Sequence, residues 1–290
     1  MKIAVASGKG GAGKTTIAVN LAVVSGRESS HKITYADCDA EEPNGHLFLK
    51  PVITGISPVE IPVPQIDFDK CDYCGECAKI CRFSALAVIK ENVLVFPEMC
   101  HGCGGCSLIC PQKAITEIPR QIGEIKTGTA GNLNYISGLL RIGDATVTPI
   151  IRRIKNALPP DGITFIDAPP GTSCPVVESM KDVDHVLLVT EPTPFGLHDL
   201  KLAVETVRTM GLPFSVIINR CDAGDSRAVN YCQAENIDIL AGIKHSREAA
   251  EIYSRGGLLV DELEDFYQTF KEISEKLFYR VKALKGIPTE

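Results

Sequence analysis

Short runs of apolar residues recur along most of the chain and alternate with segments in which apolar residues return every three or four positions. We expect the runs to form buried strands and the segments between them to form helices. Strands that alternate with helices are typical of an α/β fold, in which a mostly parallel sheet is covered by helices on both faces and binds ligands beyond the carboxyl ends of its strands. The predicted strands lie at residues 2–7, 33–39, 163–171, 185–190, 214–219 and 237–243.

The regular alternation breaks between about residues 57 and 120, where cysteines, small residues and short β-like pieces replace it. Two stretches there, CDYCGECAKICRFSALAV and CHGCGGCSLICPQKAITE, align without gaps. Such internal similarity marks a duplicated unit. We therefore predict a small α+β insertion at residues 59–119 that divides the sheet domain into residues 1–58 and 120–290.

The last segment of the chain has the pattern of an amphipathic helix. We expect this helix to pack on the sheet, because its polar face mixes glutamate with lysine, whereas a helix that lies on a membrane has a basic polar face. Its apolar positions are Phe266, Phe270, Ile273, Leu277, Val281 and Leu284.

Composition and charge exclude some classes of function. The 290 residues include 30 basic and 36 acidic side chains, for a net charge of -6. A nucleic-acid-binding protein normally has a basic excess, so we expect no nucleic-acid partner. The chain has no run of about 20 apolar residues that could span a membrane, and its N-terminus does not resemble a secretory signal. We therefore expect a cytoplasmic protein that does not bind membranes.

The first predicted strand leads into a glycine-rich loop that satisfies the pattern G-x-x-x-x-G-K-[ST] in full. Backbone N–H groups of such a loop, together with the positive end of the following helix, bind phosphates. Lys14 is placed to reach the β- and γ-phosphates and the Thr15 hydroxyl to bind Mg²⁺. The predicted phosphate-binding residues are Gly8, Lys9, Gly10, Gly11, Ala12, Gly13, Lys14, Thr15 and Thr16.

Aspartates lie toward the carboxyl ends of two of the predicted strands. Asp37 and Asp39 end the second strand, and Asp167 precedes a rigid Pro-Pro-Gly turn. Hydrolysis of a nucleotide needs a group that orients water and a carboxylate behind Mg²⁺. We assign the first role to Asp39 and the second to Asp167, and we count Asp39 with Thr15 and Asp167 as the Mg²⁺ site. Asp37 could instead cap the next helix.

These motifs resemble the MinD/Mrp group of P-loop ATPases, which has a deviant Walker A motif and includes the nitrogenase iron protein. The resemblance rests on GKGGAGKTT, ADCDAEEPN, DAPPG, EPTPFGLHDL and INR, and it covers nearly all of the chain outside the insertion. It implies that Lys9 crosses a dimer interface to the partner's nucleotide and is catalytic together with Lys14 and Asp39. It also implies a homodimer, or a heterodimer with a related ATPase. With the insertion, the chain is similar to the subgroup that carries an inserted ferredoxin domain.

Two residues are candidates for contact with the base. Asn219 falls where this family contacts adenine, whereas Asn219 and Asp222 together have the N-x-x-D spacing with which G proteins bind guanine. The resemblance favours ATP.

Eight cysteines fall into two runs with the spacing C-x₂-C-x₂-C-x₃-C. This is the pattern of two-cluster bacterial ferredoxins, in which the fourth cysteine of each run binds the other cluster. The pattern predicts two [4Fe–4S] clusters rather than zinc, which usually takes separated pairs of cysteines, or disulfides. The first predicted set is Cys71, Cys74, Cys77 and Cys110, and the second is Cys100, Cys103, Cys106 and Cys81.

Four cysteines lie outside the two runs. Cys174 follows the Asp167 turn, where the resemblance makes an intersubunit metal or redox role conceivable, although an inert thiol is the alternative. We expect Cys38, Cys221 and Cys232 to pack in the core. His101, inside the second run, is expected at the surface.

Three functions fit this combination of motifs. The first is an ATP-gated electron-transfer protein that uses ATP, Mg²⁺ and two [4Fe–4S] clusters and serves a redox or metallocofactor partner protein. The second is a carrier or scaffold that donates iron–sulfur clusters. The third is a positioning ATPase of the cell-division or partition type, which would need a membrane helix or a DNA-binding surface. The sequence favours the first.

Overall fold

Most strands of the structure pair into one sheet, with the order β11-β10-β9-β1-β8-β2-β7-β6-β3. The structure is a computed structural model, and it describes residues 1–286. The strands are β1 (Lys2–Ala6), β2 (Ile33–Asp37), β3 (Val52–Ile66), β6 (Ile115–Ala130), β7 (Leu133–Leu140), β8 (Ile163–Asp167), β9 (His185–Thr190), β10 (Phe214–Asn219) and β11 (Ile239–Ile243). The sheet is parallel from β11 to β7, and β6 and β3 continue it in antiparallel pairing. The predicted α/β fold with a mostly parallel sheet is thus confirmed.

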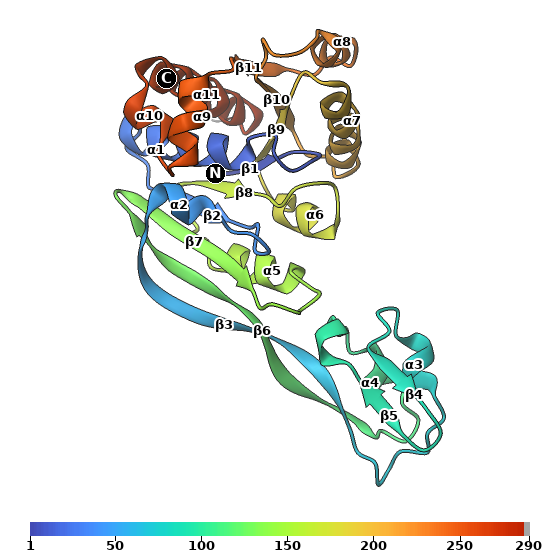
Figure 1. Cartoon of the computed structure of the whole chain (residues 1–290). Coiled ribbons are helices and arrows are strands. Elements are labelled where there is room, and N and C mark those ends of the chain that lie inside the picture. The colour runs from blue at the N-terminus through green and yellow to red at the C-terminus, as the bar shows by residue number, and fades with distance from the viewer. Residues whose placement is uncertain (287–290) are drawn as a thin grey trace.

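Helices cover both faces of the sheet, as the sequence pattern predicts (Figure 1). They are α1 (Lys14–Glu28), α2 (Gly45–Leu49), α5 (Thr148–Asn156), α6 (Cys174–Met180), α7 (Pro194–Thr209), α8 (Arg227–Ala234), α9 (Arg247–Ser254), α10 (Leu259–Glu262) and α11 (Glu264–Leu284). The alternation of β1 shows how the two cores arise. Ile3 and Val5 face the core that includes α1 and α11, whereas Ala4 and Ala6 face the core that includes α5, α6 and α7.

The position of β8 determines where the polar strand ends meet. This strand pairs with β1 on one side and with β2 on the other. In that register Asp167 lies opposite Val5 of β1 and opposite Asp37 of β2. The loop that follows β1 and the two aspartates therefore share one edge of the sheet, beyond the carboxyl ends of the strands.

A long two-stranded arm, made by β3 and β6, extends from the sheet. β6 pairs with β7 only from Gly123 onward, so its residues Ile115 to Gln121 pair with β3 alone. Antiparallel strands rise about 3.4 Å per residue, so this stretch of the arm extends roughly 25 Å. Pro58, Pro62 and Pro64 occupy alternate positions of β3, where the backbone N–H of another residue would point to the open edge of the sheet. Because proline lacks this N–H, its presence there costs no hydrogen bond between β3 and β6.

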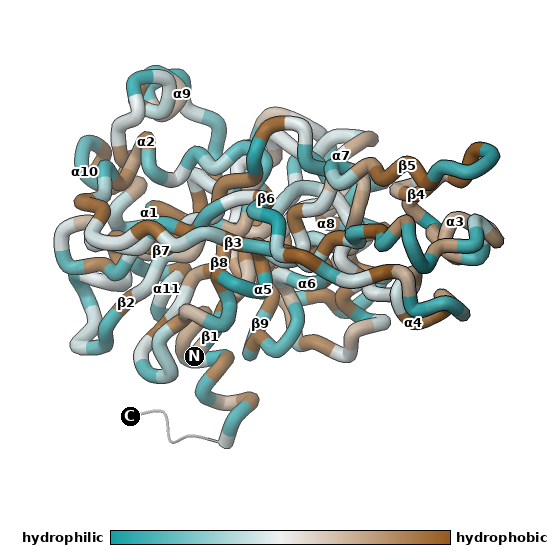
Figure 2. The backbone as a smooth tube through the Cα atoms, turned by 90° about the horizontal axis from the view of Figure 1, so that it is seen from below, coloured by the Kyte–Doolittle hydropathy of each residue, from teal (hydrophilic) through white to brown (hydrophobic). Residues whose placement is uncertain are grey.

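The cysteine-rich unit lies at the end of this arm, to one side of the body in both views (Figures 1 and 2). It contains α3 (Glu76–Ile80), the hairpin of β4 (Leu86–Val88) and β5 (Val93–Val95), and α4 (Gly105–Ile109). The two short helices follow equivalent positions of the two cysteine runs and contact each other. The predicted boundaries of the insertion fall inside strands. The first, between residues 58 and 59, lies in β3, and the second, between residues 119 and 120, lies in β6, so the arm crosses both boundaries.

The C-terminal helix α11 packs on α1, as its sequence pattern predicts. Phe270, Ile273, Leu277 and Val281 are buried, and Ser274 Oγ lies 2.8 Å from Ser25 Oγ of α1. Leu284 belongs to the same apolar pattern but is 58% exposed. No helix among residues 1–286 is long and apolar enough to cross a membrane.

We predict that Leu277→Ala lowers the free energy of unfolding by about 2–5 kcal/mol, because it removes a fully buried side chain between α11 and the sheet. Leu284→Ala is the matched control on the same helix, and it should change the free energy by less than about 0.5 kcal/mol. Urea unfolding followed by circular dichroism measures both. Equal effects of the two substitutions would contradict the packing described here.

Candidate functional site

The glycine-rich loop between β1 and α1 has the backbone that phosphate binding requires. Gly13 has a φ of 94° directly before α1 begins at Lys14, a conformation that favours glycine. The loop is also tightly packed. A Cβ on Gly13 would lie 2.5 Å from Asn219 Nδ2, and one on Gly8 would lie 2.2 Å from the carbonyl oxygen of Asp199. Larger residues at these two positions would displace the loop.

A cleft with about 1340 Å³ of open space lies above this loop. It is bounded by the start of α1, by Asp39 beyond β2, by Asn219 at the end of β10, and by side chains of α9 and α11. The predicted site residues that line it are Gly10, Gly11, Gly13, Lys14, Thr15, Thr16, Asp39 and Asn219. Gly8, Lys9, Ala12, Asp167 and Asp222 are not part of its lining.

Asp167 lies behind the cleft, buried beneath Thr15. Its Oδ2 accepts a hydrogen bond from the Tyr35 hydroxyl at 3.0 Å. Its Oδ1 is buried and has no hydrogen-bond partner among the described residues. Burial raises the pKa of this carboxyl, while Thr15 and Lys14 favour its charged form. One buried carboxylate oxygen therefore has no hydrogen-bond donor among the described residues.

The two aspartates after β2 have different environments. Asp37 is fully buried and accepts backbone N–H groups, from Gly45 at 3.0 Å and from Asp39 at 3.2 Å, which is the capping role left open by the sequence. Asp39 is half-buried at the cleft. Burial and the nearby Asp167 raise the pKa of Asp39 to about 6, against the opposing influence of Lys14. Only Asp39 of the pair lines the cleft.

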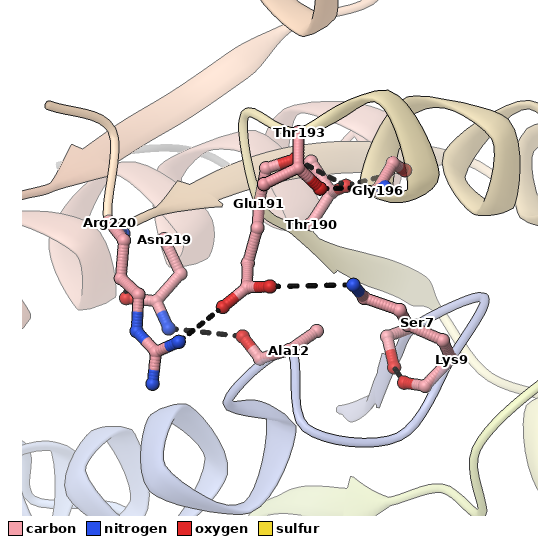
Figure 3. Close-up of polar contacts among 9 residues, drawn as sticks. All are labelled: Ser7, Lys9, Ala12, Thr190, Glu191, Thr193, Gly196, Asn219 and Arg220. Atoms are coloured by element: carbon pink, nitrogen blue, oxygen red, sulfur yellow. Dashed lines mark hydrogen bonds and ion pairs between the residues drawn. The ribbon is translucent and has the colours of Figure 1, made fainter. Parts of the chain in front are cut away.

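Lys9 turns toward its own chain (Figure 3). Its Nζ lies 3.5 Å from Oε2 of Glu191, whose Oε1 accepts a hydrogen bond from Arg220 at 2.8 Å. The side chain of Glu191 is 11% exposed, so this carboxylate joins two cations at a largely buried point. Sequence reasoning missed Glu191 and Arg220. Glu191 directly follows β9 and Asp167 is the last residue of β8, so a polar residue at a strand end is the signal that could have found Glu191.

The structure separates the two candidate base contacts. Asn219 lines the cleft and donates from Nδ2 to the carbonyl oxygen of Ala12 at 3.0 Å. The Asp222 carboxylate accepts the backbone N–H of His245 at 2.6 Å, outside the lining of the cleft.

In the cysteine-rich unit, the eight predicted cysteines divide between two cavities. One cavity is lined by Cys71, Cys74, Cys77 and Cys110. The other is lined by Cys81, Cys100, Cys103 and Cys106. Each cavity therefore takes three cysteines from one run and the fourth from the other. Across residues 1–286, no three cysteine, histidine or acidic side chains form a group that could hold a metal ion.

Backbone N–H groups point at sulfur in both cavities. Ala85 donates to Cys81 Sγ at 3.3 Å, Gly102 to Cys100 Sγ at 3.4 Å, and Ala114 to Cys110 Sγ at 3.3 Å. Burial raises the pKa of the thiols of Cys77 and Cys100, and it raises that of Cys106 to about 11. For these cysteines to bind a ligand as thiolates, that ligand would have to stabilise negative charge on their sulfurs.

The other cysteines lie away from both cavities. Cys38 and Cys232 are fully buried, and Cys221 is half-buried against the same core. Cys174 is exposed at the first residue of α6. His101 stacks on Phe83 at 3.7 Å between ring centroids and lines the second cavity.

Comparison with known proteins agrees with the geometry of the nucleotide cleft. An uncharacterized protein of Methanocaldococcus jannaschii is 32% identical over 96% of each chain. The iron-sulfur cluster carrier protein of Pyrococcus horikoshii is 26% identical over 98% of this chain and 88% of its own. The septum site-determining protein MinD of the same organism, solved with Mg-ADP, has a similar fold, with a TM-score of 0.61 at 18% identity over 95% of each chain. The CobQ/CobB/MinD/ParA nucleotide-binding domain family (CbiA) matches residues 3–260. This chain therefore belongs to the CobQ/CobB/MinD/ParA family of nucleotide-binding domains.

Proposed function

We propose that this chain is an ATP-hydrolysing iron–sulfur protein, in which a nucleotide-switched dimer couples ATP to electron transfer through two [4Fe–4S] clusters. The observation that carries the proposal is the division of the eight cysteines between two cavities, with the fourth cysteine of each run exchanged. That exchange is the arrangement in two-cluster ferredoxins. We accordingly assign residues 59–119 to an inserted ferredoxin domain and residues 1–58 and 120–290 to the ATPase domain.

The nucleotide half of the proposal rests on the loop and the carboxylates around it. Lys14 and Thr15 line the cleft at the start of α1, where the helix presents its positive end to phosphates. Mg²⁺ would be held by Thr15, with Asp39 and Asp167 beside it, and the buried Asp167 Oδ1 that lacks a donor suits an Mg²⁺-bound water. Asn219 borders the cleft and Asp222 does not, which favours adenine over guanine as the base.

The cysteine half rests on chemistry that the chain is equipped to support. The clusters, when bound, would supply one-electron transfer. The two sets of cysteines would hold them, and the N–H groups of Ala85, Gly102 and Ala114 would donate to ligand sulfurs, an arrangement that tunes cluster potentials. The exposed sides of Cys74 and Cys103 would give a redox partner access to each site.

The dimer is part of the proposal through Lys9. If Lys9 reaches the nucleotide of a second subunit, it must leave Glu191, to which it is bound within its own chain. Glu191 would then keep Arg220 as its partner, so release of Lys9 leaves no buried carboxylate unpaired. The second subunit would be another copy of this chain or a related ATPase.

A second candidate function is delivery of iron–sulfur clusters to other proteins. Relatives from three Pyrococcus species carry the name iron-sulfur cluster carrier protein and align with 98% of this chain, at 24–26% identity. A carrier would lose its clusters to an apo-acceptor protein when ATP is added. An electron-transfer protein would keep them through repeated reduction and oxidation. Iron analysis of both proteins after separation distinguishes the two.

We predict that Cys74→Ser removes one of two [4Fe–4S] signals from the reduced, anaerobically reconstituted chain, and that Cys103→Ser removes the other. Iron content should fall from about eight atoms per chain to about four in each variant. Cys174→Ser is the matched control, since Cys174 lies outside both cavities, and it should keep both signals. Electron paramagnetic resonance and iron analysis provide the readout. Full iron content in the Cys74 and Cys103 variants would refute the assignment of ligands.

We predict that kcat/KM for ATP hydrolysis falls as the pH drops through about 6, the pKa to which burial and Asp167 raise Asp39. The sign follows from the role of this group: below its pKa the carboxyl is protonated and cannot accept a proton or a hydrogen bond from the attacking water. Asp39→Asn should lower kcat by about 10²-fold or more and remove this pH dependence. An unchanged pH profile in Asp39→Asn would show that another group titrates.

We predict that Glu191→Gln strengthens nucleotide-dependent dimerisation by about twofold to fivefold, because it releases Lys9 from an ion pair worth about 1 kcal/mol or less. Glu178→Gln, which breaks an ion pair with Arg152 on α5, is the control and should leave dimerisation unchanged. Analytical ultracentrifugation with a non-hydrolysable ATP analogue measures both. Weaker dimerisation in Glu191→Gln would mean that Glu191 orients Lys9 instead of retaining it.

A further inference from the structure

Arg120, on β6, lies at the junction between the body and the cysteine-rich unit. Its guanidinium is 13% exposed and forms an ion pair through Nη1 with Asp144, whose side chain is 1% exposed. Its Nη2 lies 3.6 Å from Oε1 of Glu98, and the carbonyl oxygen of Glu98 accepts the backbone N–H of Ala145 at 3.2 Å. A guanidinium remains protonated in proteins. A permanent and largely buried positive charge therefore lies at this junction.

This charge is close to the second set of cysteines. Glu98 precedes Cys100 by two residues, and Arg120 pairs across the arm with Ile61. The loop after Cys100 packs on that same stretch of β3, since a Cβ on Gly102 would lie 3.0 Å from Ile61 Cβ. The guanidinium therefore lies on the same stretch of the arm as the loop that carries the second set of cysteines.

The basic side chains near the first set are in a different environment. Lys70 pairs with Asp67 and Lys79 with Glu76, and these lysine side chains are 63% and 70% exposed. Solvent screens such charges strongly, whereas a charge in a site of low effective dielectric acts with little loss. The two cysteine sets therefore differ in their electrostatic surroundings, although their sequences repeat.

We propose that Arg120 raises the reduction potential of a cluster held by Cys81, Cys100, Cys103 and Cys106 above that of the first set. The inference rests on the proposed function. A one-electron donor such as dithionite is oxidised as it adds one negative charge to the bound group, and Arg120 stabilises that added charge. Net charge near a cluster is one of the factors that set its potential. The first electron to enter the cysteine-rich unit thus comes to rest at the set beside the body, not at the tip.

The test is potentiometric electron paramagnetic resonance of the anaerobically reconstituted full chain, with dithionite as reductant. The Cys74→Ser and Cys103→Ser variants assign each signal to its site. Arg120→Met keeps an unbranched stem without the charge, and it should shift the reduction equilibrium of the second site at least tenfold toward the oxidised form, which is 59 mV for one electron. The first site should not move.

Two further substitutions separate charge from packing. Glu98→Gln removes the acid that faces Arg120, so it should shift the second site in the opposite direction, by about twofold to fivefold because Glu98 is 56% exposed. Arg120→Lys should restore most of the wild-type potential. Arg82→Met is the control, since Arg82 follows the ligand Cys81 but is exposed, and it should change either equilibrium by less than about twofold.

Equal shifts of both sites in Arg120→Met, or a shift in neither, would overturn this inference while leaving the two-cluster function intact. The same holds if Glu98→Gln moves the second site toward the oxidised form, and that variant decides the matter if Arg120→Met does not fold. A wild-type chain that shows fewer than two cluster signals would overturn the proposed function and this inference together.

Discussion

The parallel pairing of β8 with β1 on one side and β2 on the other is the constraint on which the nucleotide site depends. It sets Asp167 opposite Asp37, and it brings both beside the strand that ends in the phosphate loop. Two carboxyls so close and so deeply buried would repel each other if both were charged without compensation. The backbone N–H groups of Gly45 and Asp39 donate to Asp37, and the Tyr35 hydroxyl donates to one oxygen of Asp167. The other oxygen of Asp167 is buried and has no donor among the described residues, so it is the one polar atom of this pair that the fold leaves unsatisfied.

The same sheet also determines how far the cysteines lie from the nucleotide. β3 and β6 are the last two strands of the sheet, and only they continue past β7 into the arm. The two cavities are arranged in order along this arm, because the second is lined by Pro62 and Pro64 and the first by Ile66 and Ile115 at its end. The set nearer the body is therefore the one that includes Cys100, which follows Glu98, the residue to which Arg120 is paired.

The sequence predicts the sheet strands of the body except β7, and it predicts the two cysteine sets, because these features leave local signals. Apolar runs with polar ends identify β9 and β10 to the residue, and the spacing of eight cysteines predicts the crossed grouping found in the cavities. The arm could not be predicted in this way. Three prolines at alternate positions of β3 interrupt its apolar pattern, and only the pairing of β3 with β6 shows why they are tolerated. Glu191 and Arg120 were missed for a related reason, since their roles come from ion pairs between residues distant in sequence.

A continuous line of contacts joins the Asp167 turn to the second set of cysteines. The turn leads into α6, and α5 is tied to α6 by an ion pair between Arg152 and Glu178 and by the Lys155 ammonium, which donates to the carbonyl oxygen of Glu178 at 2.8 Å. The loop before α5 carries Asp144, which holds Arg120. Movement of the Asp167 turn with nucleotide state would thus reach Arg120 through packed elements, while the first set, at the tip of the arm, has no equivalent connection among the described residues. Because the Coulomb energy between two charges falls with distance, a displacement of Arg120 would change the potential of the cluster proposed at the second set more than that of the cluster proposed at the first.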